Sequence, residues 1–474
     1  SNIGELMPLI LGTNSIKDTG YEVANSVRLN QGDHAHFSKT PSTSNGTTFT
    51  YSFWVKRARV DVNSFMLRMV ASDNSEVDLL FEPSGNIRIQ EYEGVSGTNK
   101  WKYVTNRLFR DPSAWYHVMY VVDTNNGTAS DRVQLYINGV RETSFSTATN
   151  PSSGATSALS KGEARGIGGQ VGGSSNSFDG YMAEVVYVDG TAKSTTDFGE
   201  FDDSGIWKPI DVSDMSLGSN GWYLDFEDSS SLGNDASGSN NWTSNNLTSI
   251  DQTTDTCTNN FATMNPLANQ GTVTFSDGNL STNQSNNSAN VQGTIFVNSG
   301  KWYWECKSTD ANTNLAFGIM RDDTRYTQSD IYQVVGTIMW YKGNGQLFDN
   351  IPTSTGGISS AYGNTWGDGD IVSCAMDLDN GYLYFAKNGT YQNSGVPTSG
   401  ATGTGGISIP TGEFFTAVLG NGSGSTSASS SMNFGSPPFS ISSGNADGEG
   451  FGNFEYAVPS GYFALCTKNL AEYG

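Results

Sequence analysis

Residues 115–141 read WYHVMYVVDTNNGTASDRVQLYINGVR, and residues 368–391 read DGDIVSCAMDLDNGYLYFAKNGTY. Each stretch contains an apolar strand, a turn with Asp or Asn before Gly, an aromatic strand and a final Asn-Gly pair. The matching turn residues are Asp123, Asn126 and Gly127 in the first copy and Asp377, Asn380 and Gly381 in the second. We therefore predict two related β domains in tandem.

The two copies differ in how they distribute apolar residues over the strand faces. In 115–122 both faces are largely apolar, which predicts a strand inside a sheet. In 371–378 only one face is apolar, as expected of a half-buried strand in a sandwich. Asn-Gly supplies the positive φ angles that two-residue hairpins require, so Asn126-Gly127 and Asn380-Gly381 predict chain reversals.

The composition agrees with a protein made of sandwiches. A chain of 474 residues with 56 glycines suits two units of roughly 200 residues each, built from short strands and tight turns. No long stretch has the periodicity of a helix. We predict an all-β protein of two tandem concanavalin A-like jelly-roll sandwiches.

The charge and the hydrophobic runs exclude several kinds of partner. A net charge of -22 with only 25 Lys and Arg residues disfavours nucleic acid, which needs clustered cations. No apolar run approaches the roughly 18 residues of a membrane span, so no membrane insertion is expected. The N-terminus has no basic region before an apolar core, which argues against export through a signal peptide.

The cysteines and histidines predict no catalytic or metal centre. None of Cys257, Cys306, Cys374 and Cys466 forms a CxxC pair, and Cys374 shares an apolar strand face. His34 and His36 would share a strand face and could hold a metal, but no third ligand is placed by spacing, so we favour a polar face. His117 fits a core position. Nucleophile elbows and phosphate loops are missing from the sequence.

The first half resembles the laminin-G/concanavalin A-like lectin family. The motifs that carry this resemblance are FTYSFWVKR (49–57), WYHVMYVVD (115–123), VQLYINGV (133–140) and FDGYMAEVVYVDG (178–190). The resemblance implies a jelly roll over residues 21–205. Residues 1–20 then form an N-terminal arm whose apolar run, 6–11, is either a packed strand or an anchor into a larger assembly.

An acidic strand in this half supports an alternative function. Glu76, Asp78 and Glu82 in EVDLLFE resemble the acidic strand of endo-glucanases with a related jelly roll, in which carboxylates on one face cleave the glycosidic bond. Leu80 interrupts the spacing of that pattern. The two interpretations are a glycan-cleaving depolymerase and, as we favour, a solvated strand face.

The second half resembles the SPRY domain. The matching motifs are GKWYWEC (300–306), the repeat at 368–391 and MNFGSPPF (432–439). The resemblance implies a sandwich at 267–474 that holds protein partners through its loops, with a closing strand within 461–474. Residues 206–266 are predicted as an aromatic junction rich in Ser, Asn and Gly, with at least one strand around 221–227.

Two kinds of ligand have candidate residues. Laminin-G-like domains often carry calcium, and 123–127 and 377–381 are oxygen-rich turns, but neither continues to a bidentate Glu. We therefore predict no metal site and no cofactor, with calcium as the alternative. Sugars would stack on exposed aromatic rings. The candidate sugar-binding residues, all near Gly-rich turns of the second half, are Trp340, Tyr341, Tyr362, Trp366 and Tyr391.

The order of the two domains resembles virion proteins of marine tailed bacteriophages. The resemblance implies a non-enzymatic tail-fibre, receptor-binding or capsid-decorating protein that is assembled in the host bacterial cytoplasm. Its expected partners are other virion proteins and a host surface glycan or receptor. We also expect a homo-oligomer, namely a trimer, although no coiled-coil heptads are present.

Overall fold

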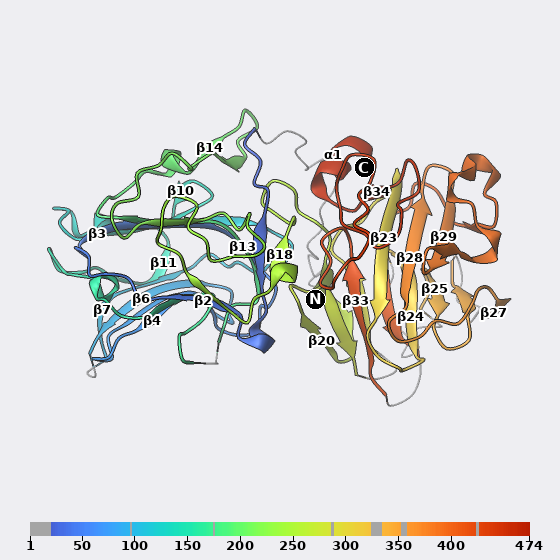
Figure 1. Cartoon of the computed structure of the whole chain (residues 1–474), viewed down its shortest axis with the longest axis horizontal. Coiled ribbons are helices and arrows are strands. Elements are labelled where there is room, and N and C mark those ends of the chain that lie inside the picture. Colours follow the sequence, from blue (N-terminus) through green and yellow to red (C-terminus); the bar gives the residue numbers. More distant parts are fainter. Residues whose placement is uncertain are drawn as a thin grey trace, which may run out of the picture. The chain divides into compact units, whose positions relative to one another are not determined.

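A computed structural model describes residues 20–94, 97–173, 176–285, 289–323, 334–351, 358–422 and 426–474. The described chain divides into two compact units, residues 20–258 and 259–474. Strands dominate both units (Figure 1), which confirms the all-β prediction. The predicted N-terminal arm lies almost wholly outside the described residues.

The first unit contains two antiparallel sheets. The first sheet has the order β10 (Val140–Arg141), β9 (Val133–Ile137), β8 (Tyr116–Asp123), β3 (Thr48–Arg57), β13 (Gly180–Asp189), β1 (Ser26–Leu29), β18 (Gln252–Thr253), with β16 (Trp222–Leu224) also paired to β13. β8 lies between β3 and β9, inside the sheet as predicted. Its two apolar faces are covered by different clusters, since Val118 and Tyr120 lie in the main core and Met119 and Val121 in a cluster on the other side.

The second sheet of this unit faces the first across one core. Its order is β11 (Phe145–Thr149), β7 (Thr98–Thr105), β6 (Ile87–Glu93), β5 (Glu76–Phe81), β4 (Ser64–Val70), β12 (Arg165–Ile167), β2 (His36–Lys39), β17 (Thr243–Asn245). A separate hairpin joins β14 (Gly199–Phe201) to β15 (Trp207–Pro209). Short 3-10 turns occur at Gln31–Asp33, Ala129–Asp131, Ala158–Ser160, Thr195–Asp197 and Ser249–Asp251.

The residues predicted as a junction contribute strands to the first unit. β16 pairs with β13, β17 with β2, and β18 with β1. Trp222 and Trp242 are buried in the same core as Phe53 and Leu79. Residues 206–258 are therefore part of the folded body of this unit.

The second unit is also built from two sheets. One has the order β19 (Met264–Gln270), β22 (Asn290–Gly293), β32 (Phe415–Asn421), β24 (Leu315–Arg321), β25 (Thr337–Tyr341), β26 (Gln346–Asp349), β27 (Ile358–Ala361). The other has the order β20 (Val273–Ser276), β21 (Ser281–Gln284), β33 (Ala428–Asn433), β23 (Lys301–Ser308), β28 (Ile371–Asp377), β29 (Tyr382–Lys387), β30 (Thr390–Tyr391). In addition, β31 (Ile407–Ser408) pairs with β29, and 3-10 turns lie at Gln392–Ser394 and Pro397–Thr402.

The C-terminus closes the second unit with a short strand and a helix. β34 (Phe463–Ala464) lies parallel to β23, and α1 (Thr467–Tyr473) follows it. The predicted closing strand is therefore only two residues long. Thr467–Tyr473 of that segment form a helix instead, which buries Leu470 against the core.

The sequence repeat is also a structural repeat. The order β10-β9-β8-β3-β13 in the first unit matches β30-β29-β28-β23-β33 in the second. Asn138-Gly139 and Asn388-Gly389 are two-residue turns with φ angles of 49° and 75°, and of 46° and 76°. In each turn the Asn side chain accepts a backbone hydrogen bond, from His117 at 2.8 Å and from Ile371 at 2.9 Å.

The other Asn-Gly pairs reverse the chain through longer loops than predicted. Nine residues, 124–132, join β8 to β9, and Gly127 does not have a positive φ. This connection includes a 3-10 turn, so ordinary backbone angles suffice to reverse it. Gly381 has a φ of 75°, but it ends a four-residue loop, 378–381.

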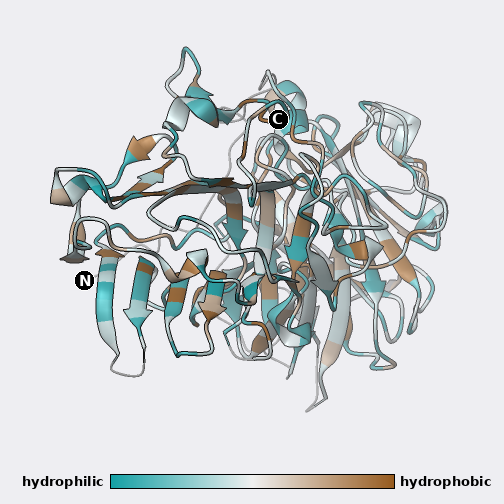
Figure 2. Ribbon diagram, turned by 60° about the vertical axis from the view of Figure 1, so that its left-hand side comes forward, coloured by the Kyte–Doolittle hydropathy of each residue, from teal (hydrophilic) through white to brown (hydrophobic). Residues whose placement is uncertain are grey.

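Each unit covers the outer face of its repeated sheet with the chain that follows. We call residues 198–223 the first strap and residues 436–466 the second strap. In the first unit, Phe198 and Leu217 of the strap pack on Met119 and Val188 of the sheet. In the second unit, Phe454 and Tyr462 pack on Tyr303 and Tyr384. Figure 2 shows hydrophobic and hydrophilic residues alternating along strands of the protein.

One aromatic ring from each strap lies on the repeated Asn-Gly turn. A Cβ atom added to Gly139 would lie 2.3 Å from the ring of Trp207, and one added to Gly389 would lie 2.6 Å from the ring of Tyr456. Only glycine permits such close approach at a positive φ. The straps are thus equivalent parts of the two repeats.

Candidate functional site

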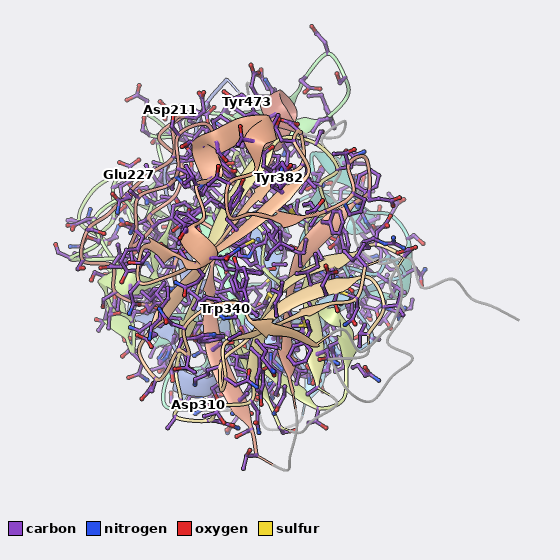
Figure 3. The ribbon with its side chains drawn as sticks, turned by 90° about the vertical axis from the view of Figure 1, so that its right-hand side faces the viewer. Asp211, Glu227, Asp310, Trp340, Tyr382 and Tyr473 are labelled. Carbon is purple, nitrogen blue, oxygen red and sulfur yellow. The ribbon has the colours of Figure 1, made fainter. Side chains whose placement is uncertain are left out.

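The structure places two of the predicted sugar-binding residues in the core of the second unit. Trp340 and Trp366 are only 0% and 3% exposed, and their ring centroids are 5.9 Å apart. Figure 3 labels Trp340 among the side chains of the strands. A sugar cannot stack on rings that have no free face, so the prediction for these two residues is corrected. Tyr362 packs edge-on against Trp340 at 6.3 Å.

The three tyrosines of that set are partly buried, and no two of them lie on the same strand. Tyr341 comes from β25 and Tyr391 from β30, which belong to different sheets. The Tyr341 hydroxyl donates to Asn314 Oδ1 at 2.9 Å, and the Tyr362 hydroxyl accepts from the Phe385 amide at 3.3 Å. Sugar binding at these tyrosines stays a prediction.

The oxygen-rich turns are satisfied by groups of the protein. Asp377 Oδ2 lies 2.9 Å from the Lys301 ammonium, and both carboxylate oxygens accept from Asn380. The ammonium group of Lys301 is therefore already paired with the carboxylate that a calcium ion in this turn would use. Asp123 accepts from the backbone of Asn125. Within the described residues, no three His, Cys, Asp or Glu side chains lie together as a metal site requires.

The predicted histidine pair is not placed on one strand face. His34 has a φ of 56° in the turn before β2, and β2 begins at His36. The left-handed backbone at His34 breaks the alternation that would align the two rings. His36 Nδ1 instead lies 2.7 Å from the carbonyl oxygen of His34.

A small hollow in the first unit brings three polar side chains under the strap. Ser52, His117 and Glu184 line it, together with Phe198 and Val212 of the strap. Glu184 reaches this face because β13 bulges between Ala183 and Val186, where Glu184 has a φ of 51°. The Tyr223 hydroxyl donates to Glu184 Oε2 at 2.8 Å.

The electrostatics of this hollow favour neutral groups. Burial, together with the nearby carboxylates of Asp225 and Glu227, raises the pKa of Glu184 to about 8, although the hydrogen bond from Tyr223 lowers it. Burial lowers the pKa of His117 to about 3. Ser52 Oγ lies 2.8 Å from His117 Nε2, which is the spacing of a nucleophile and its base. An imidazole with so low a pKa is a poor general base at neutral pH, so the contact supports a packing role for His117.

A second group of polar side chains crosses the outer face of the second sheet. The pairing register places Arg68 beside Asp78, Asp78 beside Gln90, and Gln90 beside Lys102. We call these four residues the polar row. Their neighbours along the strands lie in the core, namely Leu67, Val77, Leu79, Ile89, Trp101 and Tyr103. The polar row therefore points away from the core.

The predicted acidic residues lie on this same face. Arg68 Nη2 lies 3.6 Å from Glu76 Oε2, and Arg68 Nε lies 3.6 Å from Asp78 Oδ1. Arg88 Nη1 donates to Glu82 Oε1 at 3.0 Å. Burial raises the pKa of Asp78 to about 6, although Arg68 lowers it. The three carboxylates thus share one face, as predicted, and each lies opposite an arginine.

Reasoning from sequence did not single out Arg68, Gln90 or Lys102. These residues lie on β4, β6 and β7, so only strand pairing brings them beside Asp78. A weak signal exists in the alternation of IRIQEYE, residues 87–93, where Arg88 and Gln90 occupy the polar positions. That pattern places residues on a face but does not identify the neighbouring strand.

Comparison with protein-family models finds two domains in this chain. Residues 29–197 match Laminin_G_3, described as the concanavalin A-like lectin/glucanases superfamily, and residues 301–435 match the SPRY domain. These matches confirm the tandem order of a concanavalin A-like domain and a SPRY domain.

Two solved structures are similar to part of this chain. The crystal structure of the SPRY domain of human HERC1 is 15% identical, with a TM-score of 0.28, over 36% of this chain and 96% of that chain. A crystal structure of a human SPRY domain is 13% identical, with a TM-score of 0.24, over 32% of this chain and 90% of that chain.

Proposed function

Because a concanavalin A-like domain and a SPRY domain lie in tandem in this chain, we propose that it is a structural and adhesion protein without enzymatic activity. The tandem itself supports this proposal most, since both domains suggest protein–protein or carbohydrate binding. The satisfied turns and the low pKa of His117 are consistent with a binding role.

The finer form of the proposal places the protein on the virion of a tailed bacteriophage. It would act there as a tail fibre, a receptor-binding protein or a capsid decoration, assembled in the host cytoplasm. Its partners would be other virion proteins and a host surface glycan or receptor, without nucleic acid or membrane insertion. The net charge of -22 is consistent with such partners, and no helix of the described residues is long and apolar enough to cross a membrane.

The oligomeric state belongs to the same proposal. Repeated copies on a particle imply a homo-oligomer, and a trimer is the form we expect. Sedimentation of the purified protein over a range of concentrations measures the state directly. A species that stays monomeric at the highest concentration would contradict this part of the proposal.

The test of the main proposal has two readouts. Purified protein is applied to a glycan array, and labelled antibody against it is imaged on intact phage particles. Adhesion predicts binding to one class of host polysaccharide and label on the tail, whereas decoration predicts label on the capsid shell. Absence of both glycan binding and particle labelling would refute the proposal.

The alternative is a glycan-cleaving depolymerase, favoured by the row of carboxylates on β5. It predicts that the protein shortens a polysaccharide that it binds, and that Glu76→Gln and Glu82→Gln abolish this activity. Size-exclusion chromatography of the polysaccharide after incubation separates binding from cleavage. Chains of unchanged length would support the proposed binding function.

A further inference from the structure

The Asn-Gly pairs of this chain differ in how firmly the structure holds them. In any such pair the glycine amide nitrogen can attack the side-chain carbonyl carbon of the asparagine, because glycine has no Cβ atom to hinder the approach. The attack needs an amide that is not engaged elsewhere and a backbone that can deform. The sequence contains eight such pairs, which begin at Asn45, Asn126, Asn138, Asn220, Asn344, Asn380, Asn388 and Asn421.

Seven of the eight pairs are held in place. In four of them the glycine amide donates to a backbone oxygen at 2.6 to 3.2 Å, and these glycines are Gly221, Gly345, Gly381 and Gly422. In three others the glycine has a positive φ and is packed against a side chain, so that an added Cβ atom would lie 2.3 to 2.6 Å from its nearest neighbour. These glycines are Gly46, Gly139 and Gly389.

Gly127 has neither restraint. It is exposed, its φ is ordinary, and no atom lies within 4 Å of a Cβ atom added to it. Among the described residues, none accepts a hydrogen bond from its amide. Its loop, residues 124–132, is longer than the two-residue turns and can deform more easily. The nitrogen that must attack is therefore accessible and not engaged.

Two hydrogen-bond donors contact the oxygens of Asn126 that would gain negative charge. Arg132 Nε donates to its backbone carbonyl oxygen at 2.9 Å, and the Thr128 amide donates to its Oδ1 at 2.9 Å. The backbone carbonyl is conjugated with the Gly127 nitrogen, so the guanidinium stabilises the charge left when that nitrogen loses its proton. The Thr128 amide stabilises the charge that develops on Oδ1 during the attack.

Arg132 is fixed in the orientation that this contact needs. Its Nη1 donates to the carbonyl oxygen of Pro151 at 2.9 Å, while its Nε donates to Asn126. Two carbonyl groups thus hold the planar guanidinium. The donor to the Asn126 carbonyl is therefore in place before any reaction begins.

We propose that Asn126 converts spontaneously to aspartate and isoaspartate through a cyclic imide with Gly127. The Gly127 nitrogen loses its proton and bonds to the side-chain carbonyl carbon of Asn126. The bond from that carbon to the side-chain nitrogen breaks, and ammonia leaves with the proton. Water then opens the imide at either of its two carbonyl groups. The overall reaction consumes water, releases ammonia and involves no oxidation, and it leaves a new carboxyl group in the loop.

Peptide mapping of the aged protein tests this inference. The purified full chain is kept at mildly alkaline pH and sampled over several weeks, and each sample is digested with a protease active at acidic pH, which limits further conversion. Mass spectrometry measures the fraction of acid at each Asn-Gly pair, and chromatography separates isoaspartate from aspartate. Asn126 should convert roughly tenfold faster than any other pair, since its glycine is unrestrained and two donors assist it.

The same incubation in urea separates structure from sequence. Without the fold, all eight asparagines precede an unrestrained glycine, so their rates should be similar. An advantage of Asn126 that persists unchanged in urea would overturn the structural origin of the reaction.

Matched variants test the two parts of the site. Arg132→Met should slow conversion of Asn126 about tenfold, because it removes a hydrogen bond to a developing charge. Arg141→Met is the control, since Arg141 donates to Ser130 and Asp131 of the same loop and not to Asn126. Gly127→Ala fits the open space and should also slow the attack.

Thermal unfolding of all three variants verifies that each one is folded. Asn126 that stays intact while another pair converts would overturn the inference. Equal rates in Arg132→Met and Arg141→Met, or a Gly127→Ala protein that converts as fast as the wild type, would overturn it as well.

Discussion

The carboxyl group of Glu184 makes the first unit sensitive to pH. Its pKa is raised to about 8 in the folded protein, mainly by burial, whereas an ordinary glutamate titrates near 4.5. An acid whose pKa is raised by folding favours the protonated folded state. Stability is therefore fully present below about pH 4.5, falls as the pH rises to about 8, and is constant above that.

We predict that Glu184→Gln removes this loss of stability between pH 4.5 and pH 8. The amide keeps an oxygen that accepts from Tyr223, but it never ionises. The variant should gain stability over the wild type between pH 5 and pH 8, by an amount on the order of a few kcal/mol at pH 8. Urea unfolding at several pH values measures the difference, and Glu200→Gln on the exposed hairpin serves as control. A difference that does not change with pH would contradict the prediction.

Single glycines in the two repeated turns are predicted to be irreplaceable. Gly139→Ala and Gly389→Ala each place a Cβ atom against an aromatic ring at a positive φ. We expect a loss of roughly 2–4 kcal/mol of unfolding free energy for each. Gly127→Ala is the matched control, because its φ is ordinary and no atom lies within 4 Å of the added Cβ. It should change stability by less than about 0.5 kcal/mol.

The straps are the elements that complete each sandwich. Trp207 is 7% exposed, and its ring contacts the rings of His117 and Phe201. Without the strap, the outer faces of Met119 and Val188 would be open to water. The strap thus turns a two-sheet sandwich into a body with three layers on this side.

We predict that Trp207→Ala destabilises the first unit by about 3–5 kcal/mol, because it leaves a cavity over Gly139. Phe201→Ala, in the same hairpin, removes a ring that is 50% exposed and should cost far less. Thermal unfolding followed by near-ultraviolet circular dichroism measures both. Equal effects of the two substitutions would show that the strap does not hold the sheet.

At the scale of the whole chain, the limits of a foldable unit differ from the limits of the matched domain. The family match to the first domain ends at 197, but the compact unit extends to 258. Residues 206–258 supply β16, β17 and β18 and the buried Trp222 and Trp242. These residues belong to the core that a shorter fragment would leave open.

We predict that a fragment of residues 20–258 unfolds cooperatively on heating, whereas a fragment of residues 20–205 does not. The reason is that the shorter fragment loses three buried tryptophans, Trp207, Trp222 and Trp242, and a partner of β13. Calorimetry of the two purified fragments tests this. A cooperative transition in the shorter fragment would show that residues 206–258 are dispensable.

The success of sequence reasoning depended on whether the relevant contact is local. The largely apolar run of 115–122 and the Asn138-Gly139 pair specify a buried strand and a tight turn from neighbouring residues alone. The burial of Trp340 and Trp366 could not be predicted in this way, because a ring near a glycine turn looks the same in a core and on a surface. From the sequence, the nine-residue loop around Gly127 was likewise indistinguishable from a two-residue hairpin turn.

The sequence by itself determined the strand periodicity, the repeat and the order of the two domains, since these depend on side-chain alternation and glycine backbone freedom. Only the tertiary structure decided that Arg68, Asp78, Gln90 and Lys102 form one row, and that the straps cover the repeated sheets. Strand pairing joins residues that are far apart in the chain, and its register follows from the packing of the whole core. No local pattern specifies that register.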